Sequence, residues 1–193
     1  MADKELLVVG GPNGAGKSTF VISYLAEKSC PFLCADSIAT ELGHLDALAQ
    51  QVEAGREFVR RTEAQLARAE DFVVESTLSG RTLKSYLRRA GDAGFKITIV
   101  FIYVDSPDTC VSRVRARVRR GGHNVPEEDI RRRFLRSCRN FWHIYREIAD
   151  YWYVIYNSSG EFKRIASGEP NAMSILDAKV FGQFQQLVEG IEK

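Results

Sequence analysis

Long apolar runs are absent from this sequence of 193 residues. Nowhere do the roughly eighteen consecutive apolar residues needed for a transmembrane helix occur. The first ten residues mix acidic side chains with Lys4 around a short apolar run, which is not the pattern of a secretory signal peptide. Charge is nearly balanced, and a net charge of +2 by itself implies neither nucleic acid nor an acidic membrane as partner. We therefore expect a soluble cytoplasmic protein that does not bind membranes.

Metal-binding residue types are also few. The chain has 4 cysteines and 3 histidines, and neither set shows ligand-like spacing. These residues are Cys30, Cys34, Cys110, Cys138, His44, His123 and His143. We therefore expect cysteines that pack as small apolar side chains, rather than a disulfide framework or a zinc site. No internal repeat or linker occurs, so residues 1–193 are expected to form a single domain.

Short β-rich runs alternate with helical patterns along the chain. Five runs read as strands, at 6–10, 32–35, 72–74, 95–104 and 151–156, and a further short strand is expected at about 162–165. The tail at about 174–191 repeats apolar positions at helical spacing and is expected to pack on the domain. This alternation predicts an α/β fold with a parallel five-stranded sheet flanked by helices. Ligands of such sheets bind beyond the carboxyl ends of the strands.

A glycine-rich segment follows the first expected strand. It matches GxxxxGK[ST] and is followed by a helical pattern, which is the context that a phosphate-binding P-loop needs. Lys17 is expected to reach the β- and γ-phosphates of ATP, with GTP not excluded, and the Ser18 hydroxyl to bind Mg²⁺. The expected nucleotide-binding residues in this segment are Gly11, Pro12, Asn13, Gly14, Ala15, Gly16, Lys17, Ser18 and Thr19. The fold class thus narrows to a P-loop NTPase fold.

Two acids follow expected strands at the ligand edge of the sheet. Asp36 has two readings of equal weight from position alone, as the base of a kinase or as the N-cap of a following helix. Glu75 could contact a polar substrate or a water of Mg²⁺, or belong to a capping cluster for the helix near Thr82. Either Glu75 or Asp105 could serve as the acid that assists Mg²⁺.

Ten arginines lie in two helical stretches joined by Gly121-Gly122. A helix, a glycine hinge and another basic helix predict a lid over about 107–148 that closes on a triphosphate. Arg113, Arg117 and Arg120 share one face by their spacing, and arginines delivered in this way neutralise charge on a transferred phosphoryl group. For most of the ten, a solvated charged face is the better interpretation. His123 by itself favours a surface or capping role.

With these motifs in hand, the chain resembles the zeta-toxin family of P-loop kinases, especially its compact bacterial members. The matching stretches are GPNGAGKST at 11–19, ADSIA at 35–39, AGR at 54–56, ESTLSGR at 75–81, RVRARVRRGGHNVPEEDIRRRF at 113–134, NFWHIYREIADYW at 140–152 and YNSSG at 156–160. The resemblance implies a kinase fold with an arginine-bearing lid. It also implies an antitoxin protein as a partner class.

The resemblance assigns roles residue by residue. Asp36 would be the base that activates a substrate hydroxyl, and Lys17, Arg113 and Arg117 would hold the phosphates. Asn157 would lie near the adenine, and His123 stands where larger members place a second phosphate-contacting arginine. The expected catalytic residues are thus Asp36, Lys17, Arg113 and Arg117, with Arg120 and Asn157 added to the nucleotide site, and with Asp36, Glu75, Thr77, Arg81 and His123 as acceptor-binding residues.

Three functions follow as hypotheses. The leading one is an ATP-dependent kinase that transfers the γ-phosphate to a hydroxyl, with UDP-N-acetylglucosamine, the acceptor of larger zeta toxins, as the first candidate. The alternative is a nucleotide-dependent binding module or ATPase that engages a protein partner with little or no phosphotransfer. A third is a nucleic-acid 5′-hydroxyl kinase, which is disfavoured because no aromatic platform is interleaved with the arginines before Phe141-Trp142.

Overall fold

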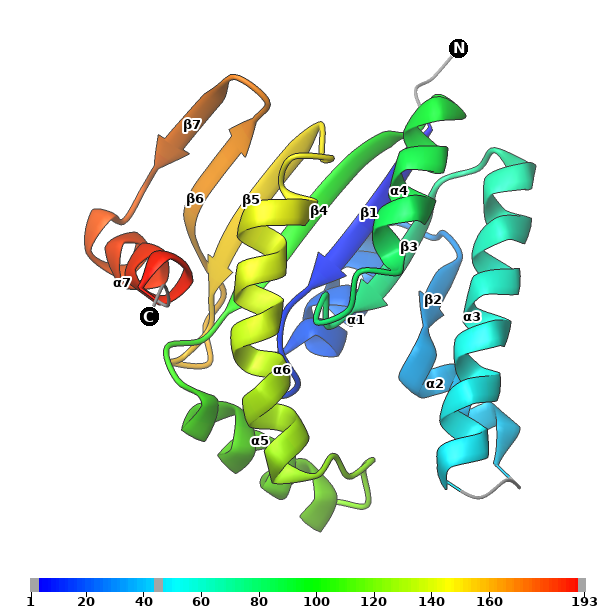
Figure 1. Ribbon diagram of the computed structural model, residues 1–193, viewed down its shortest axis with the longest axis horizontal. Coiled ribbons are helices and arrows are strands. Elements are labelled where there is room, and N and C mark those ends of the chain that lie inside the picture. Colours follow the sequence, from blue (N-terminus) through cyan, green and yellow to red (C-terminus); the bar gives the residue numbers. More distant parts are fainter. Residues whose placement is uncertain (1–3, 44–46, 191–193) are drawn as a thin grey trace.

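The computed structural model describes residues 4–43 and 47–190, so His44 and the last position of the expected C-terminal helix, residue 191, lie outside the described part. Its centre is a seven-stranded sheet in the order β2-β3-β1-β4-β5-β6-β7 (Figure 1). The strands are β1 Glu5–Gly10, β2 Phe32–Cys34, β3 Phe72–Ser76, β4 Lys96–Tyr103, β5 Tyr151–Tyr156, β6 Lys163–Glu169 and β7 Ala172–Ile175. The helices are α1 Lys17–Glu27, α2 Ala35–Leu42, α3 Ala47–Arg68, α4 Leu83–Asp92, α5 Pro107–Arg119, α6 Glu127–Asn140, the π-helix η1 Phe141–Tyr145 and α7 Ala178–Glu189.

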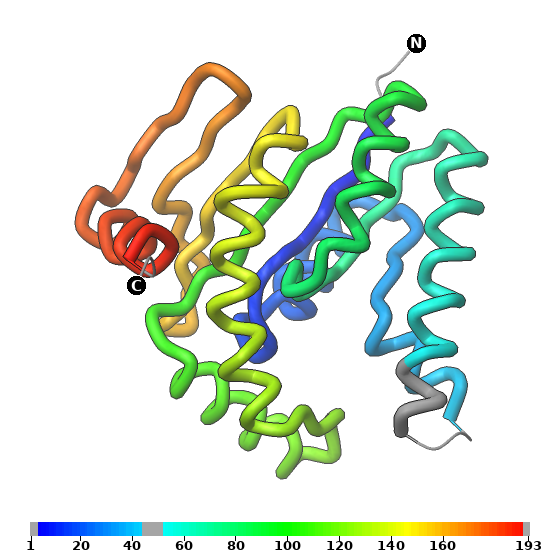
Figure 2. Tube along the Cα trace, in the orientation of Figure 1, coloured from blue at the N-terminus to red at the C-terminus, as the bar shows by residue number. Residues whose placement is uncertain are grey.

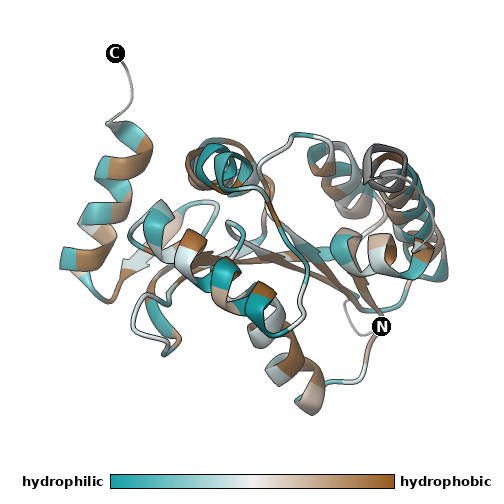
Figure 3. Cartoon of the chain, turned by 90° about the horizontal axis from the view of Figure 1, so that it is seen from below, coloured by the Kyte–Doolittle hydropathy of each residue, from teal (hydrophilic) through white to brown (hydrophobic). Residues whose placement is uncertain are grey.

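Helices cover both faces of the sheet because its central strands are apolar on both faces. In β1, Leu6 and Val8 enter one core cluster while Leu7 and Val9 enter the other, as the two-residue period of a strand requires. The first cluster packs against α4, η1 and α7, with α3 at its margin, and the second packs against α1 and α5. Figure 2 traces these helices along the chain, and Figure 3 shows the apolar strands between the two helical layers.

The predicted P-loop α/β fold is confirmed, and the five strands β1 to β5 are all parallel. The strand count was too low, because β6 and β7 extend the sheet in antiparallel fashion. Residues 174 and 175 were expected at the start of the last helix but belong to β7 and pair with β6 instead. That helix starts at Ala178, where the Asp177 side chain caps it by accepting from the Val180 amide at 3.1 Å. The expected strand near 162–165 is the start of β6.

The topology decides what gathers at the ligand edge. The strand β1, which leads into the phosphate loop, lies between β3 and β4, and β3 separates it from β2. The carboxyl ends of β1 to β5 therefore share one edge, and Figure 1 shows α2 and α5 beyond that edge. Within the described residues no helix combines the length and apolar character needed to cross a membrane.

Candidate active site

The phosphate loop joins the end of β1 to the start of α1 through backbone that only glycine adopts easily. Gly14 has φ +80° and Gly16 has φ +103°, both in the left-handed region. A Cβ on Gly16 would lie 2.5 Å from the Asn157 Nδ2, and one on Gly14 would lie 2.6 Å from the Cys110 carbonyl oxygen. Both glycines are therefore required by conformation and by space, which leaves the amides of this turn available to surround an anion.

Three polar side chains meet directly under this loop. Lys17 is 7% exposed, and its Nζ donates to the Pro12 carbonyl at 3.1 Å and lies 3.8 Å from the Glu75 Oε1. The Ser18 Oγ donates to the Glu75 Oε2 at 2.9 Å. Glu75, near the end of β3 and 6% exposed, thus has the cationic and hydroxyl partners that a buried carboxylate needs. These contacts place the lysine and serine of the motif where phosphate and its counter-ion would bind.

Asp36 lines the same cavity, of about 350 Å³, as Lys17, Ser18 and Glu75. It sits in the first turn of α2, whose N-cap is Cys34, so the N-cap reading of Asp36 does not apply. Its side chain is exposed, in contrast to the buried Glu75. Because β3 separates β2 from β1, Asp36 approaches the phosphate loop across the end of β3 and not from a neighbouring strand.

The opposite wall of the cavity is built by α5 and the end of β5. The Arg113 guanidinium donates to the carbonyls of Asn157 at 2.5 Å, Ser158 at 3.1 Å and Gly14 at 3.5 Å. The Asn157 Nδ2 donates to the Ala15 carbonyl at 2.8 Å. Arg113 and Asn157 therefore fasten the phosphate loop to the β5–β6 connection.

Arg117 projects from the next turn of α5 into the same cavity and donates to the His123 carbonyl at 2.7 Å. Its Nε is buried and has no hydrogen-bond partner among the described residues. Arg113 and Arg117 thus both line the cavity beside the phosphate loop. Arg120 does not line it and instead forms the C-cap of α5.

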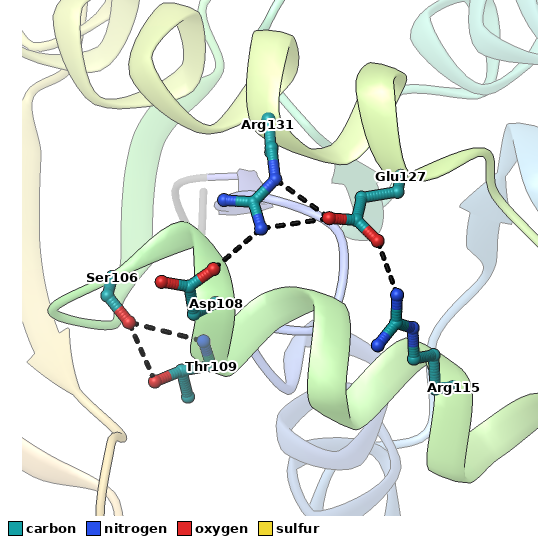
Figure 4. Close-up of polar contacts among 6 residues, drawn as sticks. All are labelled: Ser106, Asp108, Thr109, Arg115, Glu127 and Arg131. Atoms are coloured by element: carbon teal, nitrogen blue, oxygen red, sulfur yellow. Dashed lines mark hydrogen bonds and ion pairs between the residues drawn. The ribbon is translucent and has the colours of Figure 1, made fainter.

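Other arginines of the segment hold α5 and α6 together. Arg131 donates to Asp108 at 2.6 Å and to Glu127 at 2.9 Å, and Arg115 donates to Glu127 at 2.6 Å (Figure 4). The Ser106 Oγ accepts from the amide of Thr109 at 3.2 Å and caps α5, as its place before Pro107 indicates. The guanidinium groups of these arginines form ion pairs between α5 and α6, so in this arrangement they do not bind a nucleotide.

Three expected acceptor residues lie outside the nucleotide cavity. The Thr77 Oγ1 is 2.8 Å from the Ser79 Oγ, Arg81 lines a separate cavity beside α6, and His123 lies in the loop between α5 and α6. The sequence analysis missed Phe162, whose ring packs at 5.5 Å against Phe20 and lines the nucleotide cavity. An aromatic residue two positions after the 158–160 turn was the available signal.

The donor set beside the loop fits Mg²⁺ better than a softer metal. Ser18 and Glu75 offer hydroxyl and carboxylate oxygens, the ligand types that Mg²⁺ combines with substrate phosphates and water. Asp105 is exposed and accepts from Tyr156 at 3.1 Å, away from Ser18. Within the described residues no group of three or more His, Cys, Asp or Glu side chains could form a metal cage. Glu75, and not Asp105, is therefore the acid next to the expected metal position.

Burial makes the cysteines near the site chemically unreactive. The described thiols are all free, and three of them, Cys34, Cys110 and Cys138, are buried. Burial raises the pKa of the Cys110 thiol, under the phosphate loop, to about 12. Cys110 therefore serves as a small packing residue beneath Gly14, as the composition suggested.

Comparison with known proteins begins with the sequence. A family model described as an AAA domain matches residues 6–139. An uncharacterised protein of Haemophilus influenzae is 27% identical over 124 residues, which are 64% of this chain and 88% of that protein.

Solved structures share the fold. A chain of the PezAT chromosomal toxin–antitoxin system of Streptococcus pneumoniae matches with TM-score 0.69 at 13% identity, covering 100% of this chain and 81% of that one. The AvrRxo1-ORF1:-ORF2 structure with ATP matches with TM-score 0.72 at 20% identity, covering 94% of this chain and 63% of that one. Shikimate kinase of Bacteroides thetaiotaomicron matches with TM-score 0.53 at 17% identity over 98% of this chain and 99% of that one. These matches confirm the expected resemblance at the level of the fold. Because the family model spans more than half of the chain, the protein belongs to the AAA domain family.

Proposed function

We propose that this protein is an ATP-dependent kinase that transfers the γ-phosphoryl group to a hydroxyl of a small molecule. One observation carries the proposal: the exposed carboxylate of Asp36 lines the cavity that also holds Lys17, Ser18 and Glu75. A protein that only binds nucleotide does not need a second, exposed acid in the cavity beside the phosphate loop. A kinase needs one there to accept the proton of the attacking hydroxyl.

In this mechanism the acceptor oxygen bonds to the γ-phosphorus while the bond from that phosphorus to the β,γ-bridging oxygen breaks. Asp36 takes the hydroxyl proton, and ADP leaves with the bridging oxygen. Lys17 exchanges its contact with the Pro12 carbonyl for the β- and γ-phosphates, and Arg117 adds positive charge from α5. Ser18 and Glu75 would hold Mg²⁺, which would supply positive charge to the phosphates. Arg113 keeps the loop in place from the other side.

The first acceptor to try is UDP-N-acetylglucosamine, because of the resemblance to zeta toxins. Phosphorus NMR of the protein with Mg·ATP, with and without this sugar nucleotide, tests donor and acceptor together. The matched variant is Asp36→Asn, which keeps the size of the side chain and removes its basic oxygen. A new phosphomonoester signal that needs both the sugar nucleotide and Asp36 supports the proposal. Full transfer by Asp36→Asn would exclude the mechanism, and intact ATP in every mixture would exclude kinase activity with this acceptor.

A second candidate is a nucleotide-dependent module that engages a protein partner such as an antitoxin. The observation in its favour is that two structures with this fold, PezAT and AvrRxo1-ORF1:-ORF2, belong to two-component assemblies. In this case ATP would stay intact while bound, and a complex with the partner would form only in its presence. Size-exclusion chromatography of the two proteins with and without Mg·ATP distinguishes this function from phosphotransfer.

A further inference from the structure

A second cavity, of about 840 Å³, lies on the α6 side of the molecule, away from the phosphate loop. It is lined by Ser79 and Arg81 from the β3–α4 loop, by Arg136, Arg139 and Asn140 from α6, and by residues of η1 and of the end of α7. Arg81 and Arg136 thus bring two guanidinium groups to one cavity, and Glu189 is the only carboxylate among its described lining residues. The cavity is therefore cationic.

Its arginines differ from those in the first half of the same helix. Arg131, Arg132 and Arg133 each pair with a carboxylate of the first turn of α6, Glu127 or Asp129. Arg136 has arginines three and four residues before it and three residues after it, and like charges at such spacings destabilise a helix. Within the described residues neither Arg136 nor Arg81 forms an ion pair. Positive charge without an internal counter-ion, gathered around a cavity, is the feature of an anion site.

The loop that carries Arg81 is fixed in place. The Asn140 Nδ2 donates to the Leu78 carbonyl at 2.8 Å, and the Tyr145 hydroxyl donates to the Gly80 carbonyl at 2.7 Å. Burial raises the pKa of Tyr145 to about 12, so this donor keeps its proton at neutral pH. Ser79 and Arg81 are thus held against α6 before any ligand arrives, which lowers the entropic cost of binding.

The backbone of Leu78 shows that packing imposes the conformation of this loop. It has φ +55° although it is not glycine, a conformation that costs on the order of 1–3 kcal/mol. Its side chain is 1% exposed and packs so close to Gly10 that a Cβ there would lie 2.4 Å from the Leu78 Cδ1. The strained residue therefore locks the loop onto the end of β1.

The same loop connects the two cavities. It begins at Glu75, beside Lys17 and Ser18, and reaches Arg81 six residues later. We propose that the second cavity binds the phosphate group of a phosphorylated ligand through Arg81 and Arg136. This anion site rests on the arginines alone and does not depend on the proposed kinase function. Guanidinium groups suit this ligand because their planar fork matches two phosphate oxygens.

Calorimetric titration with inorganic pyrophosphate tests the site in the full chain. Excess Mg²⁺ and a non-hydrolysable ATP analogue keep the phosphate loop filled, and salt at about 0.15 M screens weak surface attraction. We expect Arg81→Gln and Arg136→Gln each to weaken pyrophosphate binding about tenfold or more, as the loss of a charge-assisted hydrogen bond implies. Arg136→Lys keeps the positive charge but not the planar guanidinium, so its affinity for pyrophosphate should lie between those of the wild type and Arg136→Gln.

Arg88→Gln is the matched control, because Arg88 is an exposed arginine of α4 outside this cavity. Pyrophosphate that fails to bind the wild type, or that binds Arg81→Gln and Arg136→Gln within about twofold of it, overturns the site. An equal loss in Arg88→Gln also overturns it, because that result means general charge attraction. If pyrophosphate binds as expected while phosphorus NMR shows no transfer to UDP-N-acetylglucosamine, the anion site stands and only kinase activity with that acceptor is excluded.

Discussion

Replacing Asn157 by alanine separates two roles for this residue at the nucleotide site. The resemblance to zeta toxins implies a place beside the adenine, whereas in the structure the Asn157 Nδ2 donates to the Ala15 carbonyl at 2.8 Å. Asn157 is 5% exposed and Ala15 is fully buried, so water cannot replace the lost donor. The geometry therefore makes Asn157 a brace of the phosphate loop.

The magnitude follows from that contact. An unsatisfied buried carbonyl costs about 1–3 kcal/mol, so Asn157→Ala should lower the free energy of unfolding by about 2 kcal/mol. For a chain of this size, the melting temperature should then fall by about 4–8 °C. Arg113 is expected to stay in place, because it contacts the main-chain carbonyl of residue 157 and not its side chain.

The functional assay compares three ligands. A loosened loop binds every phosphate chain less well, so ATP, GTP and tripolyphosphate should each lose affinity by about tenfold in calorimetric titrations. Asn171→Ala, an exposed asparagine between β6 and β7, is the control and should change neither stability nor affinity. Weaker binding of ATP alone, with the affinities for GTP and tripolyphosphate unchanged, would refute the role of Asn157 in bracing the phosphate loop. That result would instead support a position of Asn157 beside the adenine.

Three further perturbations test other parts of the structure. Gly16→Ala introduces a Cβ at φ +103° and 2.5 Å from a side-chain nitrogen, so ATP affinity in calorimetry should fall at least about tenfold; unchanged affinity would contradict the loop geometry. Tyr145→Phe removes a 2.7 Å hydrogen bond to a loop carbonyl and should cost about 1 kcal/mol in urea unfolding, and a neutral result would contradict the anchoring of that loop. The pKa of Asp71 is lowered, first by the Glu5 amide that donates to it at 2.7 Å. The ionised Asp71 therefore stabilises the folded protein above the unfolded pKa of about 3.9, and this stabilisation is lost as the pH falls through the lower folded pKa. Unfolding of Asp71→Asn followed between about pH 5 and pH 2 should therefore depend less on pH than that of the wild type, and equal slopes would exclude this linkage.

Some of the site could be read from the chain because its causes are local. The phosphate loop needs its glycines for left-handed backbone within a few residues, and the lysine and serine follow at fixed spacing. The five parallel strands were also visible, since strands buried on both faces are continuous apolar runs. Parallel strands end at one edge, and for this reason Asp36 and Glu75 could be placed near the loop before the fold was known.

Strand β7 shows why other parts of the fold stayed hidden. All four of its residues are exposed, so it lacks the alternation of a half-buried strand. Its assignment depends on pairing with β6, in which Ala166 lies opposite Ile175. Such a pairing is invisible in the local sequence.

The sequence by itself determined the phosphate loop, the parallel direction of the core strands and the two acids at the edge of the sheet. Only the tertiary structure decided which groups each arginine contacts. Arg113 and Arg131 look equivalent in the chain, yet one holds carbonyls of the phosphate loop and of the β5 end, and the other joins α5 to α6. The physical reason is that a guanidinium reaches whatever acceptor lies within its length, and those acceptors come from segments 23 or more residues away in sequence.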